Sequence, residues 1–549
     1  MNACYNRRVP PPVSGEVHEL VRSIFAERSL ADRLRGRDHR PGCLARLAAL
    51  GEIRVVPDLL PLLAADDALT PHAARTVAGL LRDVTPVQLA WIDEQARHGS
   101  EWQPWRNVWR ELTPGAVSRL AHAAALDTVA IGLLASHRNG FVRAAAIDAL
   151  GERDDGRALP FLVLRANDWV GPVAARAREL LLARLRPENR SAVLDALPFI
   201  VRMLGQRRRD HADVERAVAA VLSADAGREA LARIGAFGAF VRRFVYTRLL
   251  DAQPAPAAAV LDAALHDSDV AIRRHALRAL VGDISTQADA ATLERILRDD
   301  PAASVRTLAL TLLAERRPDR VGALLPDAIL DGAASVRDLA RFLARAHRVP
   351  VVPLDVYRRG LGSTAPRQVT AAIAGVGEVG GREEAALVAA HLDAPVARRR
   401  RAALRALARL NPEGGARAAL LALADQTPTV RSLAVYILGA RGAVADFAEV
   451  GRRVRAVPDP RARRDLLQVW ARAPKWEAVA VLLDAVADAD GDVRARAAGH
   501  LARWVDAFNR SQTAPTADQR ARIVERLDAA APSLPEATAQ ALRFVIARA

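Results

Sequence analysis

The chain has 549 residues, of which 51% are hydrophobic, 26% charged and 4% aromatic, and its formal net charge is +16. So much apolar side chain excludes a disordered protein, and the composition excludes collagen-like and disulfide-rich classes. Only Lys475 is a lysine, so arginine supplies 78 of the 79 basic residues. Codon bias in a GC-rich genome explains this choice as well as nucleic-acid binding does, so the charge alone indicates no partner.

The two cysteines, Cys4 and Cys43, lie far apart and have no histidine or cysteine neighbour at metal-ligand spacing. We therefore expect no disulfide, no metal site and no cofactor. The first residues lack the apolar segment of a signal peptide, and no uncharged apolar run approaches the ~18 residues that span a bilayer. We expect a cytoplasmic protein that does not enter a membrane.

A short pattern recurs along the chain: Val-Arg, then an apolar residue four positions after the valine, then leucine. The clearest copies start at Val142, Ile272, Val305, Val336, Val430 and Val493, and weaker copies start at Cys43, Ala74, Val173, Val241, Arg399 and Ala462. From residue 241 the starts are 31 to 33 residues apart once a start near residue 367 is counted, and the intervals 74–142 and 173–241 each hold two periods of 34. About 15 repeats therefore fill most of the chain.

Each repeat is predicted to be a pair of helices. The segments before the Val-Arg pairs have apolar residues at i, i+3, i+4 and i+7, as in 58–63, 259–265, 291–297 and 480–486. The segments after them have the same period, and no window alternates with the period of a strand. Residues 254–256 and 348–359 are expected to be irregular connections. A helical hairpin with two apolar sides must stack on its neighbours to bury them.

An aspartate stands six residues before the arginine in several repeats. The pairs are Asp267–Arg273, Asp300–Arg306, Asp331–Arg337, Asp425–Arg431 and Asp488–Arg494. We expect the aspartate to cap the second helix, and the arginine to reach an aspartate or carbonyl of a neighbouring repeat. The result would be a ladder of charge-assisted bonds, so these arginines are poor candidates for ligand binding.

This pattern resembles the HEAT family of repeats, in particular the short bacterial HEAT-like form also found in phycobilin lyases. The resemblance covers roughly residues 43–505 and implies an all-α fold, an α-solenoid superhelix of about 15 HEAT-like helical hairpins. We expect an N-terminal helical cap over 1–40, the solenoid over 41–506 and a C-terminal helical cap over 507–549. In related solenoids the second helices line the concave surface, and the resemblance implies the same here.

Candidate binding residues follow from this arrangement. With the valine as position 0, positions 0, +4 and +8 are predicted to be buried, so positions +2 and +6 face outward. The arginines and aromatic residues at these outward positions are Arg243, Arg274, Arg278, Phe342, Arg401, Arg405 and Tyr436. Such a mixture suits an acidic protein segment or a nucleic-acid backbone. A solvated arginine-rich face is the plainer alternative.

Other basic and aromatic clusters have plain interpretations. Arginine-rich runs stand at 207–209, 398–401 and 461–464 and can grip phosphates, but a solvated surface is the plainer interpretation. Arg400 occupies the ladder position, and four consecutive residues of a helix point in different directions. Trp102, Trp105 and Trp109 are predicted to fill the core of a degenerate repeat; the sharper alternative is an aromatic anchor for a peptide or nucleobase.

The sequence contains no Gly-rich phosphate loop, no His-Glu-x-x-His and no Gly-x-Ser-x-Gly. The HEAT-like deoxyhypusine hydroxylase holds iron with recurring His-Glu pairs, whereas this chain has only His18-Glu19. No residue pattern points to phycobilin lyase activity. We therefore predict a non-catalytic scaffold or adaptor that binds a protein partner, an acidic segment, on the concave face. The alternative is a nucleic-acid-binding protein related to the HEAT-like alkylpurine DNA glycosylases, although no catalytic aspartate can be mapped.

Overall fold

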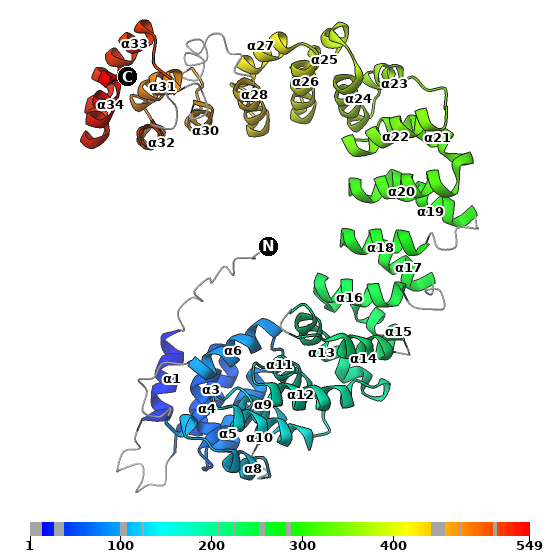
Figure 1. Cartoon of the computed structure of the whole chain (residues 1–549), viewed down its shortest axis with the longest axis vertical. Coiled ribbons are helices and arrows are strands. Elements are labelled where there is room, and N and C mark those ends of the chain that lie inside the picture. The colour runs from blue at the N-terminus through cyan, green and yellow to red at the C-terminus, as the bar shows by residue number, and fades with distance from the viewer. Residues whose placement is uncertain are drawn as a thin grey trace. The chain divides into compact units, whose positions relative to one another are not determined.

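The computed structural model describes residues 14–26, 38–98, 107–122, 126–206, 209–223, 226–251, 258–280, 287–440, 456–470, 475–508 and 513–548. Within these ranges the chain forms helices joined by short turns and contains no strand (Figure 1). It divides into two compact units, unit 1 (residues 1–282) and unit 2 (residues 283–549). The prediction of an all-α solenoid of helical hairpins is confirmed.

In unit 1, consecutive helices pair as hairpins, among them α9 with α10, α11 with α12 and α17 with α18. The helices are α1 (Gly15–Phe25), α3 (Arg40–Leu50), α4 (Val56–Ala64), α5 (Thr70–Leu80), α6 (Pro86–His98), α7 (Asn107–Arg110), α8 (Pro114–His122), α9 (Thr128–Leu134), α10 (Gly140–Gly151), α11 (Leu159–Ala166), α12 (Gly171–Arg184), α13 (Arg190–Leu204), α14 (Ala212–Ser223), α15 (Ala226–Ala232), α16 (Ala239–Leu250), α17 (Ala258–Leu265) and α18 (Val270–Leu280). The long intervals 74–142 and 173–241 hold the additional helices α6 to α8 and α13 to α15, as their lengths predicted.

Unit 2 is a regular stack of hairpins. Its helices are α19 (Gln287–Asp299), α20 (Ala303–Arg316), α21 (Pro318–Ile329), α22 (Ala334–Ala346), α23 (Pro353–Leu361), α24 (Pro366–Val379), α25 (Ala385–Ala389), α26 (Ala397–Leu410), α27 (Pro412–Ala422), α28 (Pro428–Ala440), α30 (Pro460–Trp470), α31 (Lys475–Val486), α32 (Gly491–Asp506), α33 (Ala517–Ala530) and α34 (Glu536–Arg548). The second helices α20, α22, α24, α26, α28, α30 and α32 pack in one row, each on the next (Figure 1).

The irregular connection expected over residues 348–359 is only partly correct. Residues 347–352 form a turn, but α23 begins at Pro353. A proline in the first turn of a helix is well tolerated, because the N–H group that it lacks has no partner within the helix there.

The arginine of the repeat ties each hairpin to the next. In unit 2, Nε and Nη2 of Arg306 donate to the two carboxylate oxygens of Asp331 at 2.8 and 2.7 Å, while Nη1 donates to the carbonyl of Asp300 at 2.7 Å. The same bidentate ion pair joins Arg400 to Asp425, Arg463 to Asp488, Arg143 to Asp168 and Arg242 to Asp267, always 25 residues apart. We call each of these pairs a rung. The predicted ladder is confirmed where these pairs form, whereas Arg494 bonds two carbonyls of its own turn and makes no rung within the described ranges.

The aspartate of the rung stabilises the turn and does not cap the second helix, so that expectation is wrong. Oδ1 of Asp331 accepts a hydrogen bond from the N–H of Ala333 at 2.7 Å, and α22 begins only at Ala334. The N-cap residues of α20 and α22, Ala302 and Ala333, make no side-chain cap. The physical reason is reach, since an aspartate side chain commonly bonds the backbone two residues on and forms an Asx turn.

One rung in unit 2 uses a different carboxylate. The residue 25 positions after Arg337 is Gly362, and Arg337 pairs with Glu378 of α24 instead. Arg341 donates to the same carboxylate at 2.8 Å and to the hydroxyl of the buried Tyr357 at 2.6 Å. Burial raises the pKa of Glu378, but the two guanidinium groups outweigh burial and leave that pKa below its usual value. This cluster fixes α22 against α23 and α24.

Two glycines let α24 lie close to its neighbours. A Cβ atom at Gly375 would lie 2.1 Å from the ring of Tyr357, and one at Gly377 would lie 2.5 Å from Cβ of Ala406. A side chain at either position would push α24 away from α23 or α26. The glycines therefore set the spacing of the second helices, which carry the candidate binding residues of unit 2.

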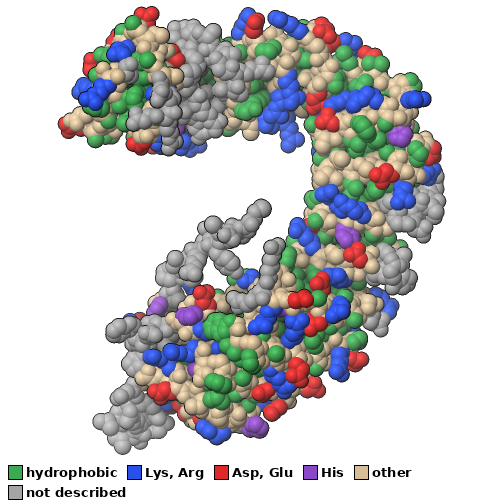
Figure 2. Space-filling view, viewed as in Figure 1, with side chains coloured by type: hydrophobic (Ala, Val, Ile, Leu, Met, Phe, Trp, Pro, Cys, Tyr) green, Lys and Arg blue, Asp and Glu red, His purple; other side chains and the backbone are tan. Residues whose placement is uncertain are grey.

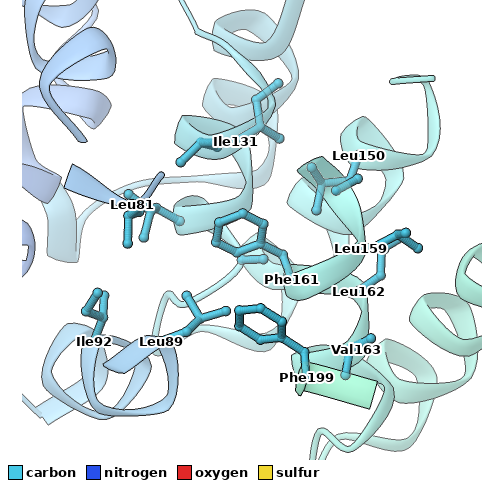
Figure 3. Close-up of a cluster of buried hydrophobic side chains, with 14 of the residues drawn as sticks. Leu81, Leu89, Ile92, Ile131, Leu150, Leu159, Phe161, Leu162, Val163 and Phe199 are labelled. Atoms are coloured by element: carbon cyan, nitrogen blue, oxygen red, sulfur yellow. The ribbon is translucent and has the colours of Figure 1, made fainter. Parts of the chain in front are cut away.

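Unit 1 departs from a stack in which hairpins touch only their neighbours. Helix α6 packs against α13, although α6 ends at His98 and α13 begins at Arg190. Figure 3 shows Leu89 and Ile92 of α6 in one buried cluster with Phe161 of α11 and Phe199 of α13. The degenerate repeat thus folds back onto helices far along the chain, which the repeat pattern did not predict.

A cluster of five charged side chains joins α6 to α11. Arg165 contacts Asp93 of α6 at 2.6 Å and Asp168 at 3.0 Å. Arg97 pairs with Asp93 at 3.1 Å, and Arg143 pairs with Asp168 at 2.9 Å. The side chains of Arg143 and Asp168 are 0% exposed. Because charges buried in this way have lost their hydration, each depends on its partners for compensation.

The single lysine stands at the start of α31 among aromatic rings. Nζ of Lys475 donates to the carbonyl of Phe508 at 2.8 Å and lies 3.6 Å from the centre of that ring. The rings of Trp476 and Trp504 meet edge to face with centroids 5.6 Å apart. These contacts join the first helix of the α31–α32 hairpin to the residues that follow its second helix.

We expect Arg306→Ala to lower the free energy of unfolding by about 1–3 kcal/mol, because it removes charge-assisted bonds to Asp331 and to the Asp300 carbonyl. Arg494→Ala is the matched control, since Arg494 bonds the carbonyls of Asp488 and Ala489 but makes no ion pair within the described part of the chain. Urea denaturation followed by circular dichroism measures both variants. Equal losses would contradict the role of the rung.

The pKa of a rung aspartate predicts that the stability of the fold depends on pH. Burial raises the pKa of Asp425, but hydrogen bonds from Arg400 outweigh it and hold that pKa below the usual 3.8. Such a carboxylate stabilises the fold fully above the pKa of the unfolded chain, and the contribution disappears as the pH falls through the folded value. Asp425→Asn should therefore be less stable than wild type at neutral pH, and the difference should shrink below about pH 3.8. A constant difference in urea midpoint down to acidic pH would refute this.

Removing an arginine from the buried charged cluster should destabilise the fold far more than removing an exposed one. Arg165→Ala should lower the free energy of unfolding by about 3–5 kcal/mol, because Asp93 and Asp168 would remain buried without that partner. Arg157→Ala is the control, since Arg157 is 57% exposed and its pairs with Asp127 and Asp155 should contribute less than about 1 kcal/mol. Thermal unfolding of both full-length variants tests this, and similar losses would show that the cluster stabilises no more than a surface pair does.

Candidate partner-binding surface

The outward positions of α22, α26 and α28 face solvent in unit 2, whereas those of α20, Thr307 and Thr311, are half-buried. Phe342 on α22 and Tyr436 on α28 are 57% and 65% exposed, and Arg401 and Arg405 on α26 are exposed as well. Positions 0 and +4 of α22 and α28 are buried, as the helical period requires. These four predicted residues therefore stand where a partner could reach them.

Four arginines form a stripe along α26, which we call the arginine stripe: Arg398, Arg401, Arg405 and Arg409. Their spacing of 3, 4 and 4 residues places them on one side of the helix. All four are exposed, and none makes an ion pair with another described residue, whereas the adjacent Arg400 forms a rung with Asp425 at 2.7 Å. Figure 2 shows a group of basic side chains over this part of unit 2.

The charges of the stripe act on one another. Burial, followed by repulsion from Arg401 and Arg409, lowers the pKa of Arg405, and Tyr436 of α28 opposes this effect. Arginine still stays protonated at neutral pH, so the stripe carries positive charge that no carboxylate of unit 2 neutralises within the described ranges. An anionic partner would remove this repulsion.

Sequence reasoning identified Arg401 and Arg405 but missed Arg398 and Arg409 as members of the same face. Arg409 stands at position +10, one turn beyond the two positions that were counted. Extending the i, i+4 series by one step would have found it.

The seven predicted residues do not form one site. Phe342 lies on α22, and α24 packs between α22 and α26. The remaining three residues, Arg243, Arg274 and Arg278, belong to unit 1, where α16 packs on α18.

The unit 1 arginines also differ among themselves. Arg243 pairs with Asp269 at 2.7 Å, and this hydrogen-bonded contact raises the pKa of Arg243 and lowers that of Asp269. Arg278 is exposed and Arg274 is half-buried on α18. Unit 1 thus has a smaller basic patch, in which Arg243 is already compensated.

The other basic and aromatic clusters are structural where the chain is described. Arg209 donates to the carbonyl of Asp168 at 3.0 Å, and Arg463 forms a rung. Trp109 is buried and its Nε1 donates to the carbonyl of Ala96 at 3.1 Å, as predicted for a core residue. Arg207, Arg208, Trp102 and Trp105 lie outside the described residues.

Across the described ranges, no three His, Cys, Asp or Glu side chains group as a metal site requires. None of the helices in those ranges has the length and apolar character to span a bilayer.

No family model and no curated protein matches the chain. Among solved structures, the chain is similar to Kap95p in its complex with RanGDP, with a TM-score of 0.31, 14% identity and coverage of 97% of this chain and 67% of that one. Importin beta gives a TM-score of 0.32 and 12% identity over 93% and 70% of the two chains. The Pds5–Scc1 complex gives 0.24 and 12% over 75% and 63%. The TM-scores and identities are low, so the fold is established by the stacked helical hairpins of this chain.

Proposed function

We propose that the protein is a non-catalytic HEAT-like scaffold or adaptor that binds an acidic segment of a partner protein. The arginine stripe carries this proposal, because it gathers uncompensated positive charge on an exposed helix face beside the exposed ring of Tyr436. The proposal includes helical caps over 1–40 and 507–549, a solenoid over 41–506, a concave face lined by second helices and a cytoplasmic location.

The dimensions of the stripe suit a peptide. Arginines four residues apart on a helix are separated by about 6 Å along its axis. Carboxylates on every second residue of an extended segment recur at about 6.7 Å, so a short acidic segment can face the whole stripe. Guanidinium groups bind carboxylates bidentately, and Tyr436 offers an apolar ring with a hydroxyl for an adjacent side chain.

The remaining predicted residues would add separate contacts for a partner. Phe342 provides an apolar contact on α22, and Arg274 and Arg278 form a second basic patch in unit 1. Arg243 contributes less, because binding a partner would have to displace Asp269.

Charge reversal tests the proposal. Arg401→Glu, Arg405→Glu and Arg409→Glu together should reduce binding of a fluorescein-labelled, Glu-rich peptide by roughly 100-fold, since each lost contact contributes about 1 kcal/mol. The matched control reverses three exposed arginines of first helices, Arg298, Arg359 and Arg417, and changes net charge equally. Fluorescence anisotropy at two salt concentrations measures both. If both triple variants lost peptide binding equally, the net charge of the protein and not the stripe would explain the binding, and the proposal would be wrong.

A single-stranded thymidine oligonucleotide serves as the competing probe. Nucleic-acid binding would require aromatic rings in series for base stacking, in addition to phosphate contacts. We expect the oligonucleotide to bind more weakly than the acidic peptide at the same salt concentration. Tighter binding of the oligonucleotide, lost in the stripe variant, would overturn the protein-partner proposal in favour of the nucleic-acid alternative.

A further inference from the structure

Unit 1 has a groove of about 1270 Å³ between the second helix α5 and a row of first-helix segments. One wall is α5 with the turn that follows it, and the other is built from the beginning of α9, residues 156–161, α13 and residues 233–237. This surface shares no residue with the arginine stripe, which belongs to unit 2. We call it the first-helix groove.

The base of the groove belongs to the core that α6 shares with α11 and α13. Leu81, Phe161 and Phe199 line it at its buried base, where they belong to the same core cluster (Figure 3). The wall behind them is tightly packed, since a Cβ atom at Gly156 would lie 2.3 Å from Cβ of Ala192. The groove is therefore a fixed feature of the fold of unit 1.

The lining combines apolar side chains with unpaired positive charge. Val84, Pro160 and Pro198 are partly exposed along it. Arg75 and Arg82 are exposed on the α5 wall, and no ion pair is found for either of them among the described residues. The one carboxylate of that wall, Asp83, compensates at most one of them.

The opposite wall is already neutral. Arg157 pairs with Asp127 at 3.2 Å, and Arg233 pairs with Asp195. The uncompensated charge of the groove is thus positive and confined to the α5 wall, so the complementary ligand is acidic on one side and apolar toward the base.

The length of the groove favours an extended segment over a small molecule. The wall opposite α5 consists of four segments that follow one another along the stack: the beginning of α9, residues 156–161, α13 and residues 233–237. Packed helices lie about 8–10 Å apart. The groove therefore runs for roughly 24–30 Å, which matches about eight residues of extended chain. Small-molecule sites are usually compact, with volumes of about 300–1000 Å³.

We propose that the first-helix groove binds an extended segment of a partner protein in which acidic residues alternate with aliphatic residues or proline. The acidic side chains face Arg75 and Arg82, and the apolar side chains contact Val84, Pro160 and Pro198. This binding surface is independent of the stripe, so the failure of either proposal leaves the other intact.

A glycine offers a way to fill the groove without disturbing the fold. Gly79 of α5 lines it, and a Cβ atom there would meet nothing within 4 Å. Gly79→Trp should therefore block the groove while leaving the helical circular dichroism unchanged. Gly42→Trp is the control, because Gly42 is also helical and open but lies outside the groove.

The probes are twelve-residue peptides selected by phage display on the full-length stripe variant (Arg401→Glu, Arg405→Glu and Arg409→Glu), which also carries each substitution tested here, so that the stripe does not capture them. We expect selected peptides to be enriched in Glu or Asp alternating with Leu, Val or Pro, and to lose binding in Gly79→Trp but not in Gly42→Trp. Arg75→Glu combined with Arg82→Glu should weaken them roughly tenfold, while the control Arg110→Glu with Arg119→Glu should not. Restoring the three arginines of the stripe should leave binding of these peptides unchanged.

Three outcomes would overturn the proposal. Undiminished peptide binding in Gly79→Trp would place the site elsewhere. Selected peptides without acidic residues would refute the assigned chemistry. Self-association of the wild-type protein in light scattering, abolished by Gly79→Trp, would identify a second copy of this chain as the occupant.

Discussion

A guanidinium group that serves three acceptors at once holds each hairpin in register with the next. In Arg306, two nitrogens bond the carboxylate of the following turn and the third bonds a carbonyl of its own turn. The donors of a planar guanidinium have fixed directions, and a lysine ammonium could not reproduce this geometry. The rungs therefore need arginine for a physical reason, whatever the codon bias of the genome.

Most of the fold could be predicted from the spacing of residues in the sequence, because the hairpins and rungs depend on residues at fixed short separations. The spacing could not reveal the substitution of Glu378 for an aspartate near Gly362, since that contact depends on how closely α24 approaches α22. Nor could it reveal the pairing of Asp93 with Arg165, which joins two residues with no shared pattern. The candidate surface was partly predictable: helical periodicity gave Arg401 and Arg405, but only the structure shows which neighbouring arginines lack a carboxylate.

The arginines of the chain fall into two groups, those paired with a carboxylate and those without such a pair among the described residues. Rung arginines such as Arg400 and Arg463 are neutralised by aspartates and stabilise the stack. The surplus includes the arginine stripe in unit 2 and the α5 wall in unit 1. Both surfaces lie on second helices, α26 in unit 2 and α5 in unit 1, and they share no residue. Two acidic segments could thus occupy the protein without competing for the same side chains.

The contact between Asp93 and Arg165 also has a mechanical consequence. It joins residues 72 positions apart, so a pulling force on the ends of unit 1 passes through this contact and bypasses the hairpins between them. Those hairpins carry no load until the buried cluster breaks. Once the cluster breaks, the hairpins between Asp93 and Arg165 would unfold together. Their 72 residues would then extend to roughly 240 Å in a single event. The rungs of unit 2 join only adjacent hairpins, so that unit would lengthen under tension in much smaller steps.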